Sequence, residues 1–441
     1  MKRALLAVAA LLAVVVLGAV AYGIHLVRSL NTPLFQKRLL EQAKATVGAE
    51  VRVREMDVSL LSGVSLKGIA VANPAPFPGD LLTADAFVLR YRLRPLLSGR
   101  LDVERVSLEG PALSLLMDVR GVFNYERLGR GSRKTTPAGV AVPLRVVLKR
   151  LEVDHGSVTL TDATKARLLT AKDVRLRSSF DISGGASRGS GEATVASMSF
   201  ADLLFLRSVR SPVSLATDTV TLAPVRADVA GGSAGGDVTV HTKGGFRYVA
   251  HLDVKGVKVE RLLAEAKSKG GLAGTLAGKA TFEGSGGLAT MSGRGEGTVS
   301  GCQVEDSRTL ALLASVLQVP ELASPDFDDC RAEFVQSAYR VSTPVVLLSG
   351  KAVQLRGAGA VDLRTDGLDY QMNLALAPRL FAKVTRRELR PAFKPRADGF
   401  STIDFHLSGT TAAPQTDILS RIAKGAAEDA VRKQLERLLR K

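Results

Sequence analysis

The fold of this chain is decided by the stretch VQLRGAGAVDLRTDGLDYQMNLAL, residues 353–376. In both of its halves, apolar residues or glycines alternate with polar residues. A period of two is expected of a β-strand that has one apolar and one wet face. Between the halves stands Thr365-Asp366-Gly367, which is typical of a tight turn joining two antiparallel strands. The stretch therefore predicts a β-hairpin.

The same alternation recurs from about residue 50 almost to the end of the chain, and it predicts on the order of twenty strands. The chain has 42 glycines and no tryptophan in 441 residues, which favours many short elements joined by turns. A mainly β fold follows. A closed sandwich or barrel and an open trough both fit the period, because each hides one face from water.

A few short helices interrupt the strands. Capping and apolar periodicity predict them at residues 33–47, 259–269, 307–318 and 378–390. A longer amphipathic helix is expected over residues 417–441. It would lie on an anionic membrane surface or cover one end of the β-structure. The residues of its basic face are Arg421, Lys424, Arg432, Lys433, Arg437, Arg440 and Lys441.

The chain begins with Lys2 and Arg3, followed by an uncharged run of 24 residues from Ala4 to Val27. A helix of that length spans roughly 36 Å, enough to cross a bilayer core of about 30 Å. The flanking charges favour a cytoplasmic N-terminus. The alternative is a cleaved signal peptide, because Ala19-Val20-Ala21 has the form that signal peptidase recognises. Both interpretations export the rest of the chain.

The net charge is +17, from 60 Lys and Arg against 43 Asp and Glu. An exported location argues against nucleic acid as the partner, and anionic lipid head groups are better placed. The charge could also serve solubility alone. The two cysteines, Cys302 and Cys330, form no CxxC motif. They would form one disulfide in an oxidising compartment or stay as two buried thiols.

The sequence contains no phosphate-binding loop, zinc-protease motif, nucleophile elbow or calcium loop. Residues 293–297, GRGEG, lack dinucleotide-binding spacing and are better interpreted as a glycine-rich strand or turn. The five histidines fit no metal-site spacing. We therefore expect no enzyme activity, no cofactor and no metal. An exported hydrolase is the least supported alternative.

Several ordered features resemble the AsmA family. Residues 47–128 carry a Ser-containing strand before Gly63, an Asn73-Pro74 loop ahead of Phe77, and then, in order, Leu96-Leu97-Ser98-Gly99, Gly110-Pro111, Gly121 and Asn124. Further matches lie in DHGSV at residues 154–158, in residues 327–377, and in DGFSTIDFHLSGTTAAPQTD at residues 398–417.

This resemblance implies a curved antiparallel β-groove, anchored in the inner membrane and extending into the periplasm, related to TamB and to bridge-like lipid-transfer proteins. It implies a role in phospholipid transport and outer-membrane biogenesis. The alternative is a scaffold for outer-membrane protein assembly. Alternation and resemblance together predict the residues that line the groove: Phe246, Tyr248, Leu252, Val361, Leu363, Tyr370, Met372, Leu374, Ile403 and Phe405.

The expected organisation has five parts: a transmembrane anchor (1–28), an N-terminal β-region with a short helix (29–135), a middle β-groove (136–306), a C-terminal β-repeat (307–416) and the basic helix (417–441).

Overall fold

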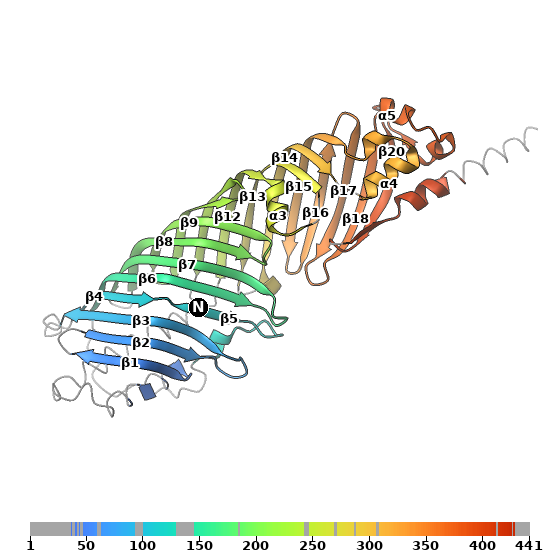
Figure 1. Ribbon diagram of the computed structural model, residues 1–441. Helices are drawn as coiled ribbons and strands as arrows, with labels where there is room; N and C mark the ends of the chain where they lie inside the picture. Colours follow the sequence, from blue (N-terminus) through green and yellow to red (C-terminus); the bar gives the residue numbers. More distant parts are fainter. Residues whose placement is uncertain are drawn as a thin grey trace, which may run out of the picture. The chain divides into compact units, whose positions relative to one another are not determined.

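The structure is a computed structural model that describes residues 37, 40, 41, 44, 47–59, 63–92, 100–128, 145–183, 186–241, 247–268, 271–285, 288–305, 308–411, 413–425 and 427. These residues form 21 strands and a few short helices (Figure 1). The mainly β fold predicted from the period of two is therefore confirmed.

The chain divides into two compact units. Unit 1 comprises Met1–Asp228 and Gly235–Ala250, and unit 2 comprises Val229–Ala234 and His251–Lys441. The five finer segments expected from the sequence stay predictions.

Unit 1 is built on a sheet whose strands follow one another along the chain (Figure 1). The strands are β1 (Val51–Ser59), β2 (Gly63–Ala72), β3 (Asp80–Arg92), β4 (Arg100–Glu109), β5 (Ala112–Leu116), β6 (Arg145–Thr161), β7 (Arg167–Ser183), β8 (Ala186–Phe200), β9 (Leu204–Ala216) and β10 (Thr219–Val229). A 3-10 turn, η2 (Asn124–Arg127), follows β5. The boundary between the units passes through β11 (Gly232–His241) and β12 (Arg247–Lys258).

One junction in unit 1 departs from the expected antiparallel pairing. β4 and β5 pair one after the other with the same strand, β3. They are separated at Gly110-Pro111, because proline has no backbone N–H to donate to a neighbouring strand. β6 pairs in parallel with both of them, from Arg100–Arg145 to Leu116–Thr161. A parallel pair needs a connection of a dozen or more residues, and the chain between Leu116 and Arg145 is long enough for it. Alternation along a strand does not reveal the direction of its neighbour.

A line of left-handed residues crosses unit 1. Each has a φ between 51° and 60°; they are Gly68, Gly110, His155, Asp173 and Ser208. Paired residues of neighbouring strands flank them in register, as Lys172–Ser197 and Val174–Val195 flank Asp173. Such residues bend the strands that carry them. Several neighbouring strands therefore bend along the same line.

Unit 2 has a second run of sheet. Its strands are β13 (Gly271–Gly284), β14 (Ser292–Glu305), β15 (Asp326–Ser337), β16 (Arg340–Ser349), β17 (Val353–Asp362), β18 (Gly367–Leu376), β19 (Lys394–Pro395), β20 (Ser401–Gly409) and β21 (Pro414–Thr416). β13 to β18 pair antiparallel in chain order, and β20 pairs with β18, β19 and β21. The hairpin predicted from residues 353–376 is confirmed as β17–β18, whose last pair is Asp362–Gly367.

The described helices are short. They are α3 (Val259–Glu265), η3 (Leu288–Thr290), α4 (Arg308–Leu317), η4 (Pro320–Leu322), α5 (Pro378–Ala382), η5 (Arg387–Ala392) and residues 418–425. α4 matches its expected range. The expected helix 378–390 is divided, because the Arg390 guanidinium donates to the carbonyls of Ala382 and Val384 and so satisfies the end of α5. α3 ends early because Lys267 turns left-handed, with a φ of 53°.

No helix in the described part of the chain is long and apolar enough to cross a membrane. The anchor expected over residues 1–28 lies outside the described residues, as do residues 428–441 of the expected basic helix. Of the helix expected over residues 33–47, the described residues 37, 40, 41, 44 and 47 are helical.

Candidate functional site, an open apolar sheet face

In unit 1, apolar side chains of neighbouring strands stand opposite one another on one face of the sheet. The register aligns Val153, Leu176 and Ala193 across β6, β7 and β8. Directly paired residues point to the same face. We call this surface the unit 1 apolar strip; its residues are Leu148, Leu151, Val153, Val174, Leu176, Phe180, Ala193, Val195, Val209, Val213, Leu215, Val220 and Leu222.

The unit 1 apolar strip is open to solvent along most of its length. Of its residues only Val195 is buried, and the others are partly exposed. At its margin, Ile182 is 47% exposed. The same face of β2 and β3 is closed, since Leu66 and Leu89 are only 3% and 1% exposed. Large exposed apolar surfaces on soluble domains mark places where a partner or ligand binds.

Unit 2 covers part of its apolar face with its own helices. Leucines of α4, η4 and α5 and the isoleucines of the final helix pack on the sheet beside Cys302, Cys330 and Leu374. Cys302 and Cys330 form a disulfide between β14 and β15, which settles the question that their spacing left open. The remaining part of this face is partly exposed. We call it the unit 2 apolar strip; its residues are Phe282, Phe334, Val341, Val361, Leu368, Tyr370 and Leu407.

Both apolar strips contain glycines beneath large side chains. A methyl group on the glycine would overlap the side chain next to it in four cross-strand pairs: Gly189 with Phe180, Gly293 with Phe282, Gly295 with Phe334, and Gly359 with Tyr370. The rings therefore lie against the backbone of the neighbouring strand instead of standing up from the sheet. The result is a flat apolar floor.

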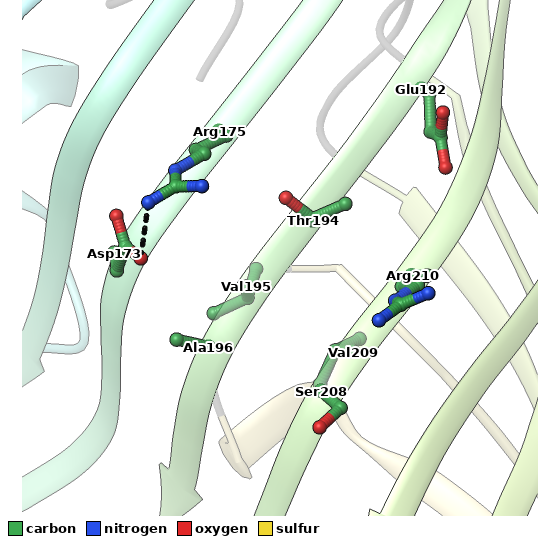
Figure 2. Close-up of a pocket in the computed structure, with 9 residues that line it drawn as sticks. All are labelled: Asp173, Arg175, Glu192, Thr194, Val195, Ala196, Ser208, Val209 and Arg210. Atoms are coloured by element: carbon green, nitrogen blue, oxygen red, sulfur yellow. Dashed lines mark hydrogen bonds and ion pairs between the residues drawn. The ribbon is translucent and has the colours of Figure 1, made fainter.

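The opposite face of the sheet is polar, and in unit 1 it holds a shallow hollow of about 370 Å³ over β7, β8 and β9 (Figure 2). The residues of the polar face that line it are Asp173, Arg175, Glu192, Thr194, Ala196, Ser208 and Arg210. A smaller hollow of about 240 Å³ lies in unit 2 beside Asn373, whose amide donates to Asp404 over 2.7 Å.

Two histidines pair with carboxylates. His155 Nδ1 lies 3.0 Å from Asp173 Oδ1, and His406 Nε2 lies 2.9 Å from Asp369 Oδ1. Within the described chain, neither imidazole is hydrogen-bonded to a serine, threonine or cysteine side chain. Both pairs therefore lack the nucleophile of a hydrolase triad. The described residues also contain no group of three His, Cys, Asp or Glu side chains arranged to hold a metal ion.

The groove residues predicted from the sequence fall into three environments. Those that are partly exposed are Tyr248, Leu252, Val361, Leu363, Tyr370 and Met372, with Leu363 at 44%. Those buried in the covered part of unit 2 are Leu374, Ile403 and Phe405. Phe246 lies outside the described residues. Burial raises the pKa of the Tyr248 hydroxyl, which fits a ring that lies partly within the sheet surface.

Of the predicted basic face, the structure describes two residues. Arg421 forms an ion pair with Asp417 at 2.6 Å, and Lys424 is exposed. The others lie outside the described residues: Arg432, Lys433, Arg437, Arg440 and Lys441. The role of this face stays a prediction.

Sequence reasoning did not select the unit 1 apolar strip, although its signal is present. Val174 and Leu176 alternate with Arg175 and Arg177, the pattern that identified the strands further along the chain.

The fold and this site define a class of protein: a mainly β chain that presents apolar sheet surface to its surroundings. The model of the AsmA family matches residues 1–219, and the chain belongs to this family. Residues 220–441 lie outside the match, so the resemblance of residues 327–377 and 398–417 stays a prediction. Comparisons with curated proteins and with solved structures gave no match.

Proposed function

We propose that this chain is a non-enzymatic lipid-handling protein that binds phospholipid acyl chains along the two apolar strips, in support of outer-membrane biogenesis. Residues 1–28 would anchor it in the inner membrane with a cytoplasmic N-terminus, and the β-structure would curve into a groove in the periplasm. Family membership is consistent with this role.

The observation that carries the proposal is the partial exposure of the unit 1 apolar strip. Apolar surface left in water costs about 25 cal/mol per Å². Moving an acyl chain from a bilayer into water costs about 0.8 kcal/mol of free energy for each methylene exposed. The chain therefore needs a path on which apolar protein surface shields it from water. The strip and the acyl chain each remove the apolar surface of the other from water.

The location of the partner follows from the same argument. A lipid path is useful only where one of its ends meets a bilayer, and the proposed anchor holds the β-structure beside the inner membrane. Phospholipids and the inner membrane are therefore the proposed partners. Outer-membrane assembly proteins remain the partners under the alternative of a protein scaffold.

The test uses adjacent residues on opposite faces of one strand. A photo-crosslinking amino acid replaces either Leu176, in the unit 1 apolar strip, or Arg177, on the polar face, in the full-length protein in living cells. Leu176 is half-buried and Arg177 is exposed. After illumination and protease digestion, mass spectrometry should find phospholipid attached at position 176 and little at position 177.

Two outcomes would count against the proposal. Crosslinks from position 176 to one protein, without lipid, would favour the scaffold alternative. Equal lipid labelling at positions 176 and 177 would mean that the two faces are not distinguished.

A further inference from the structure

We infer that the hollow on the polar face of β7, β8 and β9 binds a phosphate group. This hollow lies on the face opposite to the unit 1 apolar strip, so the inference is independent of the proposed lipid path. It rests on a row of arginines, on the absence of a carboxylate partner for two of them among the described residues, and on the local distortion of the strands.

The row is set by strand register. Thr194 in β8 stands directly opposite Arg175 in β7 on one side and Arg210 in β9 on the other. Figure 2 shows Arg175 and Arg210 on either side of Thr194. Neighbouring strands are about 4.8 Å apart, so a group placed over Thr194 lies within reach of both guanidinium groups. Arg226 in β10, which pairs with Arg210, continues the row.

Repulsion between the arginines of this row destabilises the sheet when no anion is bound. Like charges directly opposite each other on a sheet are destabilising, and Arg210 faces Arg226. Neither has a carboxylate partner among the described residues. Other strand arginines do have one: Arg177 lies 2.7 Å from Asp154. The charge of Arg210 is therefore available to an anion.

Two residues that line the hollow distort its strands. Asp173 and Ser208 are left-handed, with φ values of 51° and 52°, and they lie on either side of Ala196. Such irregularities are frequent next to functional sites, where they redirect side chains. The hollow is therefore a local departure from the regular ladder.

The side chains select a phosphate. Guanidinium groups bind phosphate oxygens through paired N–H donors, and the Thr194 hydroxyl adds one more donor. Arg175 uses one of its donors on Asp173, over 3.0 Å, and keeps the others. Asp173 is shared between Arg175 and His155. Glu192 also lines the hollow and opposes an anion, so it lowers the affinity of the site.

The test measures phosphate binding to the full-length protein in a non-ionic detergent by the broadening of ³¹P NMR lines. One titration uses inorganic phosphate. The other uses glycerophosphoglycerol, the deacylated head group of phosphatidylglycerol. Arg210→Gln should weaken binding by about 10-fold or more, the usual effect of removing a hydrogen bond to a charged group. Glu192→Gln should strengthen binding a few-fold because a like charge is removed.

Arg188→Gln is the matched control, because Arg188 is an exposed arginine of β8 that does not line the hollow. It should leave binding unchanged, and circular dichroism should confirm that all variants are folded. Tighter binding of glycerophosphoglycerol would identify a lipid head group as the ligand, and tighter binding of inorganic phosphate would identify a free phosphate. Equal weakening by Arg188→Gln and Arg210→Gln, or failure of the unaltered protein to bind either probe, would overturn the inference.

Discussion

The rings of Phe282 and Phe334 lie stacked with their centroids 6.1 Å apart, although the whole of β14 separates the strands that carry them. Gly293 and Gly295 of β14 lie beneath the two rings and leave space for them. Residues 293–297 are therefore the glycine-rich strand predicted from the sequence. Because Gly293 and Gly295 have no side chains, the rings of β13 and β15 come together on the open face of unit 2.

Replacing Gly295 by valine should displace Phe334 and destabilise unit 2. The new side chain would overlap the ring, and overpacking of this kind costs about 1–3 kcal/mol. Chemical unfolding of the full-length protein, followed by circular dichroism, measures the loss. Thr298→Val is the matched control, because Thr298 is exposed on the other face of the same strand. Its effect should stay within about 0.5 kcal/mol. Equal effects of the two substitutions would refute the close approach.

The strands and their faces could be predicted because both are local properties of the sequence. Residues 353–376 form the expected hairpin, and Val361, Tyr370 and Met372 lie on one face of it, as alternation requires. What covers a face is not a local property. Leu374 belongs to the same alternating run, yet α4 and the final helix enclose it in a closed cluster. These helices come from distant parts of the chain, so the alternation of β18 contains no sign of them.

The parallel pairing of β6 with β4 and β5 could not be predicted from the alternation of apolar and polar residues either. Residues 145–161 alternate in the same way whether their neighbour runs parallel or antiparallel, and only the length of chain between Leu116 and Arg145 distinguishes the two. Ion pairs that join neighbouring strands, such as Arg177 of β7 with Asp154 of β6, depend on the register of the antiparallel β6–β7 pair, which alternation does not determine either.

The difference between the open and covered parts of the apolar face can be tested with two similar substitutions. Leu176→Arg places a charge on the open unit 1 apolar strip, where the long side chain can reach water. The protein should fold with a loss of about 1–2 kcal/mol and should lose lipid binding. Leu374 is only 1% exposed, so Leu374→Arg should cost well over about 4 kcal/mol and prevent unit 2 from folding.

Thermal unfolding and mass spectrometry of bound phospholipid measure both effects. Ser179→Leu, at an exposed position on the polar face of β7 outside the hollow, is the control and should keep both stability and lipid. If Leu176→Arg retained a full complement of phospholipid, the unit 1 apolar strip would not be the lipid path.

The disulfide between Cys302 and Cys330 should stabilise the covered part of unit 2. It closes a loop with a sequence separation of 28, which contains α4 and η4. Restriction of the unfolded chain by a loop of this length contributes about 3–4 kcal/mol. Both cysteines are buried, at 0% and 7% exposure. Reductant alone should therefore leave them unlabelled by a thiol reagent, whereas reductant with denaturant should expose two thiols.

Unfolding by guanidinium with and without reductant measures the contribution. The reduced protein should unfold at a lower denaturant concentration, and a Cys302→Ser/Cys330→Ser variant should be insensitive to reductant. Coincident transitions for the oxidised and reduced protein would show that the covalent link adds nothing to stability.

The start of the final helix should lose stability at acid pH. Burial raises the pKa of Asp417, but the hydrogen bond from the His406 backbone N–H and the ion pair with Arg421 outweigh it and hold the pKa below its ordinary value of 3.8. A carboxyl whose pKa is lowered on folding stabilises the folded state fully above its ordinary pKa, and it loses this contribution as the pH falls through its lower folded pKa.

Asp417→Asn removes the charge and keeps the shape of the side chain. The stability difference between the original protein and this variant should therefore be constant above about pH 5 and should shrink below about pH 4. Unfolding midpoints recorded at intervals from pH 2 to pH 7 measure it, with Asp328→Asn, at an exposed aspartate of β15, as the control. A difference that grows as the pH falls would reverse the sign and show that the Asp417 carboxylate does not stabilise this helix.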